Sequence, residues 1–253
     1  MTELTPNQRL QAAMVRLLVD PAAVAALHAG RTPAGLTADQ AGLLRAVDRR
    51  AWSVDGFRRA RLLHAVLDEL PVTVSLLGLE AADAFFSSDA FGRVLTSRGS
   101  LTLAFGAWAG GRTGHLGRLE LDLARLRRWR PPRGPGLARA AAVGLVEAPP
   151  GSPEQLAALA ATLAPDPAAA LASGLRLTAP PARRGAERSL VTPGPAGASF
   201  ERPPAALAEL IAASAVRRSR ADVTAQARRL GAGDEADAVV QSLLDDGLLH
   251  DGG

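Results

Sequence analysis

The run Pro131-Pro132-Arg133-Gly134-Pro135-Gly136 is the feature of the sequence that most limits how the chain can fold. A helix cannot continue through it, because proline lacks a backbone N–H and glycine favours irregular conformations. The residues on its two sides also differ. Of the nine aromatic residues, only Phe200 follows the run, and the formal charge changes from +6 over residues 1–133 to −2 over residues 134–253. We therefore predict a domain boundary at this point.

The part ahead of the boundary has the hydrophobic spacing of helices. Leu10, Met14 and Leu17 recur at intervals of three or four residues, as on one face of a helix. The chain is rich in Ala and Leu and holds one isoleucine, Ile211, which favours helices over a large central sheet. The sequence therefore predicts a helical bundle over residues 1–133.

Two details of this bundle can be predicted. The longest helix is expected from Ser53 to Leu70, where Pro71 ends it. Its inward side chains are expected to be Phe57, Leu62, Leu63, Val66 and Leu67. Further along, Gly111, Gly114 and Gly117 are expected to form a loop between helices at 101–109 and 115–129.

The part after the boundary changes character. Residues 134–173 are interpreted as a connecting segment, in which 143–146 could be a strand and 152–163 a helix. Residues 174–253 are interpreted as a second domain of three short strands and three helices. The expected strands are 175–178, 189–192 and 198–201, and the expected helices are 204–215, 219–230 and 234–246. This β-β-β-α-α-α order predicts a winged-helix-like α+β module, so the predicted fold class is mainly α with that module at the C-terminal end.

The residues needed for common catalytic chemistry are missing or scattered. The chain has no cysteine, and no lysine for a phosphate-binding loop. Its histidines, His28, His64, His115 and His250, lack the close spacing of metal ligands. We therefore expect no catalytic residues, no metal site and no cofactor. A polar N-terminal stretch and the absence of a long apolar run lead us to expect a cytoplasmic protein without a membrane span.

A basic cluster precedes the boundary and has two interpretations. Cations in the last turn of a helix stabilise its negative end, so the cluster can be a helix cap. It can also be a docking surface for an acidic partner or nucleic acid. Its candidate docking residues are Arg125, Arg127, Arg128 and Arg130.

The predicted C-terminal module is compatible with DNA binding or with peptide capture. A DNA-reading helix must approach phosphates, yet the last predicted helix is acidic and has no arginine. Arg220, Arg228 and Arg229 on the preceding helix keep a DNA-binding regulator open as the alternative. For peptide capture, the third strand would accept an added strand and the final helix would flank the groove. The expected peptide-binding residues are Ala198, Ser199, Phe200, Glu201, Asp237, Ala238, Gln241, Ser242 and Asp245. Phe200 either fills the module's core or anchors the peptide.

Residues 59–126 resemble the N-terminal domain of the HvfC/BufC family, which is often labelled a putative DNA-binding domain. The matching residues are Arg59 or Arg61, Leu62-Leu63, Leu70-Pro71, Leu76-Leu77-Gly78, Phe86, Phe105 and Asp122-Leu123-Ala124-Arg125-Leu126. The family continues the last run with Glu-Trp and carries tyrosines, whereas this chain has Arg127-Arg128-Trp129 and no tyrosine. Residues 174–250 are similar in pattern to the PqqD-type precursor-peptide recognition element.

These resemblances imply a function. Members of the family are partner proteins of multinuclear non-haem iron-dependent oxidases that modify ribosomally made peptides. The partner binds the leader of the precursor peptide and presents its core to the iron site, whose ligands belong to the enzyme. The resemblance therefore implies a heterodimer with such an oxidase and a precursor peptide as ligand. The acidic last helix argues against nucleic acid as a partner, and the absence of a long apolar run leads us to expect no membrane partner.

Overall fold

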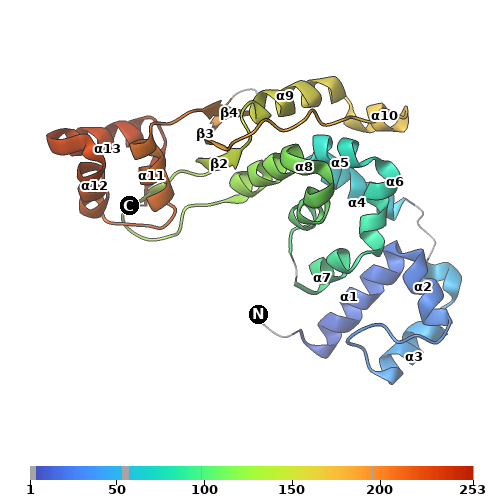
Figure 1. The fold of residues 1–253 in the computed structure, drawn as a ribbon. Helices are drawn as coiled ribbons and strands as arrows, with labels where there is room; N and C mark the ends of the chain where they lie inside the picture. Colours follow the sequence, from blue (N-terminus) through green and yellow to red (C-terminus); the bar gives the residue numbers. More distant parts are fainter. Residues whose placement is uncertain (1–3, 53–56, 98, 195–196, 253) are drawn as a thin grey trace. The chain divides into compact units, whose positions relative to one another are not determined.

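The computed structural model describes residues 4–52, 57–97, 99–194 and 197–252. Helices predominate in it, and the strands are few and short (Figure 1). The mainly helical class predicted from the sequence is therefore confirmed.

The chain divides into two compact units at places that differ from the predicted boundaries. Unit 1 is Met1–Arg118 together with Ala157–Ala179. Unit 2 is Leu119–Leu156 together with Pro180–Gly253. The prediction placed breaks at 133/134 and 173/174, whereas the segment interpreted as a connection contributes to both units.

Unit 1 consists of helices, several of which have clear start signals in the sequence. Thr5 and Thr37 each form a reciprocal capping box with a glutamine three residues later. Proline at the first position begins α1, α2, α5 and α10, where its missing N–H costs nothing. The helices are α1 (Pro6–Val19), α2 (Pro21–His28), α3 (Ala38–Ala46), α4 (Arg58–Leu67), α5 (Pro71–Leu77), α6 (Leu79–Asp83), α7 (Asp89–Ser97), most of α9 (Ser152–Leu163), α10 (Pro167–Ala172) and the first part of α8 (Leu101–Arg128).

The helix α8 bends at one glycine. Gly114 has φ 66° and ψ −147°, a conformation open to glycine, so the helix changes direction there. The sequence predicted a loop of three glycines between two helices. A single non-helical residue makes the break instead, and Gly111 and Gly117 are helical.

An aromatic cluster forms the centre of unit 1. Phe85, Phe86, Phe91 and Phe105 are all nearly or fully buried. The rings of Phe86, Phe91 and Phe105 meet Phe85 edge to face, at centroid distances of 5.5, 5.7 and 5.3 Å. This geometry is favourable for aromatic rings and adds to the free energy gained by burying them.

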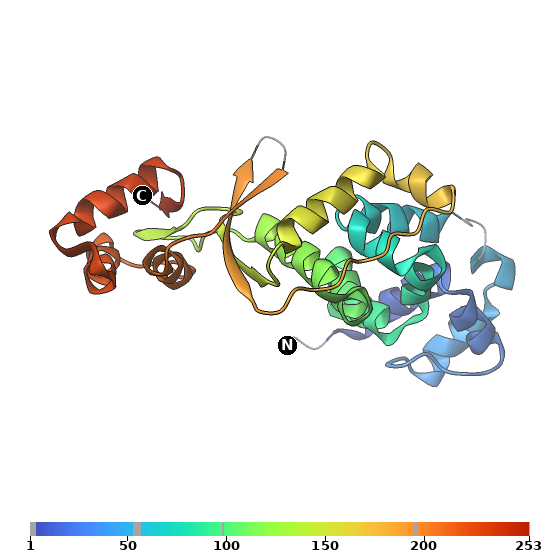
Figure 2. The same cartoon turned by 45° about the horizontal axis from the view of Figure 1, so that its top comes forward.

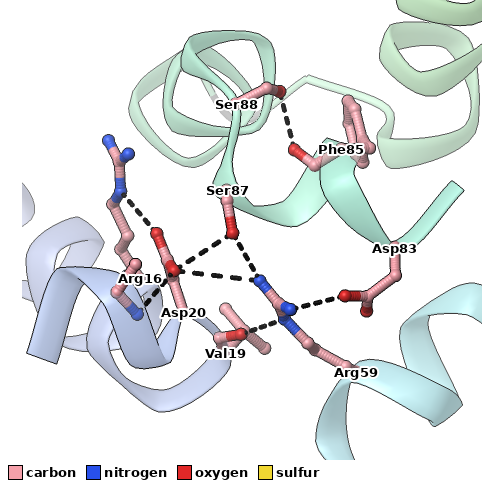
Figure 3. Close-up of polar contacts among 9 residues, drawn as sticks. Arg16, Val19, Asp20, Arg59, Asp83, Phe85, Ser87 and Ser88 are labelled. Atoms are coloured by element: carbon pink, nitrogen blue, oxygen red, sulfur yellow. Dashed lines mark hydrogen bonds and ion pairs between the residues drawn. The ribbon is translucent and has the colours of Figure 1, made fainter. Parts of the chain in front are cut away.

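A polar network joins the α1–α2 junction to the rest of unit 1 (Figure 3). Asp20 is 2% exposed and caps α2 by accepting from the Ala22 N–H at 3.1 Å. Arg59 of α4 lies 3.8 Å from Asp20, and its guanidinium donates to Asp83 and Ser87 at 2.7 Å each and to the Val19 carbonyl. One side chain thus links segments that are far apart in the sequence.

Unit 2 contains two small antiparallel sheets. The first has the order β2-β3-β4, and the second pairs β1 with β5. The strands are β1 (Leu137–Arg139), β2 (Gly144–Ala148), β3 (Glu187–Gly194), β4 (Gly197–Glu201) and β5 (Leu249–Asp251), and the helices that accompany them are α11 (Ala205–Ala213), α12 (Arg220–Ala227) and α13 (Ala236–Asp245).

Strand β1 lies between two segments from the end of the chain. Leu137 pairs with Asp251 on one side and forms a bridge with Arg218 on the other. Gly136 precedes it with φ 99°, and a Cβ there would lie 2.4 Å from the Arg218 carbonyl oxygen. The close backbone approach that begins this sheet therefore requires glycine.

Each face of the β2-β3-β4 sheet is covered. Leu145 and Leu190 contribute to a core shared with α11, α12 and α13. At Gly144, a Cβ would lie 2.4 Å from the Cδ2 of Leu126, so the end of α8 packs directly on β2. The core around Leu190 includes the apolar side of α13, which consists of Ala236, Val239, Val240, Leu243 and Leu244.

The structure corrects several predicted elements. Residues 175–178 form no strand. Leu177 is buried and donates its N–H to the Ser75 carbonyl at 3.4 Å, so tertiary contacts hold this segment against α5. The third strand of the sheet is β2 instead, at the place where a strand was considered possible within the connecting segment. The prediction also missed β1 and β5.

The predicted helix Ser53–Leu70 is shorter in the structure. Its first four residues lie outside the described residues, and α4 covers Arg58–Leu67. The inward position predicted for Phe57 is wrong, because that side chain is 75% exposed. Val66 and Leu67 are buried as predicted.

Candidate functional site

Strand β4 lies at an edge of the three-stranded sheet. Among the described residues it pairs with β3 alone, in the register that joins Val191 to Phe200. Strand β2 pairs with β3 residues 187–191, whereas β4 pairs with residues 190–194. The hairpin of β3 and β4 therefore extends past β2, and Figure 2 shows it in orange.

The register determines which backbone groups of β4 point away from β3. Gly194 and Gly197 face each other across a two-residue connection, which makes them a hydrogen-bonded closing pair. Hydrogen-bonded pairs alternate along the strand, so the N–H and C=O groups of Ala198 and Phe200 point toward the open edge. On the other side of the hairpin the corresponding position is Pro193, which has no N–H to offer.

The side chains of β4 leave this edge accessible. Ala198, Ser199 and Glu201 are exposed, and Phe200 is half-buried opposite the buried Val191. Phe200 is absent from the core that surrounds α11, α12 and α13, yet it is half-buried on β4. Its two predicted roles, filling the core and anchoring the peptide, both stay predictions.

The other predicted peptide-binding residues are exposed on α13, but several have partners on α12. Asp237 accepts hydrogen bonds from Thr224 and Arg228, both at 2.9 Å. Gln241 accepts from Arg220 at 2.8 Å and donates to Asp245 at 2.8 Å. Ser242 donates to Asp246 at 3.2 Å, and Ala238 is exposed. One carboxylate of α13, that of Asp237, is thus paired with Arg228, which directly follows α12.

The structure does not bring the two halves of the predicted groove together. Helix α13 packs on α12 and on β5, while β4 pairs with β3. The prediction placed all strands in one sheet beside the last helix. The chain instead returns at its end to form β5 with β1, and this separate small sheet takes the place beside α13. The open edge of β4 is therefore a candidate site by itself.

The predicted docking arginines lie at the end of α8, and two of them cap it. Arg128 donates to the Ala124 carbonyl at 3.0 Å, and Arg130 donates to the carbonyls of Arg127 and Trp129 at 2.8 and 2.9 Å. Arg125 forms an exposed ion pair with Asp122 at 2.8 Å. The cap interpretation therefore accounts for Arg128 and Arg130, while Arg125 and Arg127 are exposed.

Sequence reasoning missed Arg139 at the end of β1. Its guanidinium lies over the Trp129 ring, 4.2 Å from the centroid. Burial lowers the pKa of this guanidinium, because removal of water disfavours the charged form. No spacing rule joins Trp129 to Arg139, so only the fold could reveal this pair.

The structure offers no assembled metal site in its described part, since no group of three or more His, Asp or Glu side chains lies close enough together to hold an ion. Across the same residues, no single helix is long and apolar enough to cross a membrane. Helices α1 and α2 meet those criteria only as a pair, with a bend of 113° between them.

Comparison with known proteins adds no family assignment. Neither the family models nor the curated proteins contain a match to this sequence.

Proposed function

We propose that the chain is a non-catalytic partner protein that binds the leader of a ribosomally made precursor peptide at the open edge of β4. It then presents the peptide to a separate multinuclear iron oxidase. The observation that carries this proposal is the edge itself, where the backbone groups of Ala198 and Phe200 point outward and the flanking side chains are small or exposed. An extended peptide gains affinity from main-chain pairing at such an edge.

The chemistry of β4 specifies what the leader strand should contain. Antiparallel alternation puts Ala198 and Phe200 on one face of the strand and Ser199 and Glu201 on the other. A leader with an apolar side chain beside Phe200 and a basic one beside Glu201 would match both faces. The acidic surface of α13 contributes less than the sequence suggested, because Arg228 and Arg220 already bond to Asp237 and Gln241.

The test first identifies a short precursor-peptide gene beside the gene for this chain, and then measures binding of that peptide's leader by fluorescence polarisation. Ala198→Pro removes one outward N–H and leaves the bonds to β3 in place. Loss of one backbone hydrogen bond, about 1 kcal/mol, should weaken binding about fivefold. Ser199→Ala is the matched control, since it changes a side chain on the same strand and keeps the backbone donor.

The outcomes separate the possible sites. Unchanged affinity in a folded Ala198→Pro protein would refute strand addition at β4. Loss of affinity in Gln241→Trp alone would move the site to α13, as the sequence first suggested. If an iron oxidase is encoded beside the peptide, its oxidation of the peptide should require this chain. Full oxidation without this chain would refute the partner role.

DNA binding is the alternative, and one observation favours it. Arg220 of α12 is exposed, and so are Arg228 and Arg229 in the short helical segment Arg228–Ala232 that follows α12. Arg228 is paired with Asp237 of α13, however, and α13 presents further carboxylates that would repel phosphate. Retardation of a random DNA duplex by the purified chain at physiological salt would favour this alternative over peptide binding.

A further inference from the structure

Arg139 has a geometry unlike that of the other arginines near the end of α8. Its guanidinium stacks on Trp129 at 4.2 Å. Its Nη1 lies 3.1 Å from the point that a Cβ on Gly144 would occupy, so it uses space that a side chain there would fill. Two residues on different segments thus restrict the position of this guanidinium.

The structure gives this guanidinium no acceptor within its described part. The Nε of Arg139 is buried and lacks a hydrogen-bond partner, and no carboxylate forms an ion pair with the side chain. Nearby arginines differ, since Arg128 and Arg130 donate to helix carbonyls and Arg125 pairs with Asp122. A half-buried cation without a counter-ion is costly, and an anion would lower that cost.

We propose that Arg139, held against Trp129, binds a carboxylate carried by a partner polypeptide. A guanidinium presents parallel N–H groups that match the two oxygens of a carboxylate. The charges also match. The site holds one cation without a counter-ion, so a monoanion neutralises it, whereas a phosphate dianion would leave a negative charge in a partly desolvated place. This site is independent of the β4 edge, and either one can fail its test alone.

The experiment uses the full-length chain labelled with ¹⁵N, so that the arginine Nε–H and tryptophan indole resonances appear in one spectrum. Acetate is titrated against chloride at constant ionic strength. The Arg139 Nε–H and Trp129 indole resonances should shift saturably. Arg112 is the matched internal control, because it also stacks on a tryptophan, Trp108, at 4.3 Å but is exposed. Its resonance should move only slightly and without saturation.

Variants distinguish specific binding from general attraction to positive charge. Arg139→Lys keeps the charge and loses the planar fork, so the saturable shift of the Trp129 indole should disappear while the other two indole resonances stay in place. Inorganic phosphate at equal ionic strength should give a smaller response than acetate.

Three results would overturn the proposal. They are equal shifts at Arg139 and Arg112, an unchanged indole response in Arg139→Lys, and a stronger response to phosphate than to acetate. Absence of an Arg139 Nε–H resonance through fast exchange with water would also count against it, because the proposal requires that group to be shielded from solvent.

Discussion

Replacement of Arg59 by leucine should destabilise unit 1 more than removal of any exposed ion pair. The guanidinium of Arg59 bonds to the carbonyl of Val19 and to the side chains of Asp83 and Ser87, and it lies 3.8 Å from Asp20 (Figure 3). The leucine side chain keeps part of the apolar contact and removes every one of these polar interactions.

The magnitude follows from how deeply each partner is buried. The Asp83 side chain is 45% exposed, so that pair contributes at most about 1 kcal/mol. The Asp20 side chain is 3% exposed and would keep only Arg16 at 3.7 Å as a cation. The buried Val19 carbonyl loses a donor, which costs about 1–3 kcal/mol. Asp20 keeps the hydrogen bonds from Ala22 and Ser87 and loses a cation at 3.8 Å, which costs about 1 kcal/mol. With the Asp83 pair, we expect a total loss of about 2–5 kcal/mol in the free energy of unfolding.

Urea denaturation followed by tryptophan fluorescence measures this loss, since Trp52 and Trp108 both lie in unit 1. Asp83→Ala is the matched control within unit 1, because the Asp83 side chain is 45% exposed and its ion pair should contribute about 1 kcal/mol or less. If Arg59→Leu loses no more stability than Asp83→Ala, the reasoning from burial is wrong.

Three further results are expected. Gly144→Ala should destabilise unit 2 by about 1–3 kcal/mol through overpacking against Leu126. Adding Leu126→Ala to this variant should relieve the overlap at the cost of a cavity. If the two substitutions have additive effects on stability in thermal unfolding, this packing is contradicted. Gly136→Ala should cost more than Gly134→Ala in the same assay, because only Gly136 faces a backbone oxygen at close range. Simultaneous charge reversal of the four docking arginines, Arg125, Arg127, Arg128 and Arg130, should weaken complex formation with the oxidase at low salt. If the affinity of the complex is unchanged, the cluster acts only as a helix cap.

Local signals in the sequence were sufficient to predict much of the helical structure. Thr37 and Ser219 are N-cap residues of types that favour this position, and Gly247 has φ 67° just past the end of α13. Strands 189–192 and 198–201 were found because Gly and Pro separate short runs of strand-forming residues. Such signals operate within a few residues, and the sequence displays them directly.

The remaining features depend on contacts between distant segments. Residues 175–178 have a strand-like pattern, but Leu177 is buried and donates its N–H to the Ser75 carbonyl instead of to a neighbouring strand. Strands β1 and β5 have three residues each, too few to show any alternation. The groove predicted between β4 and α13 depended on which sheet accompanies α13. That is set by the pairing of β1 with β5, which joins residues more than a hundred positions apart.

The position of β1 also has a consequence for synthesis of the protein on the ribosome. Leu137 pairs with Asp251, near the end of the chain, and Gly144 of β2 pairs with Val191. Both strands therefore leave the ribosome long before their partners do. Helices of unit 1 can form from local contacts during this time, but the β2-β3-β4 sheet must wait for residue 201 and the β1-β5 pair for residues 249–251. A ribosome that stalls shortly before residue 249 would hold a chain whose β1 still has an open edge, and that chain would be a target for chaperones or proteases.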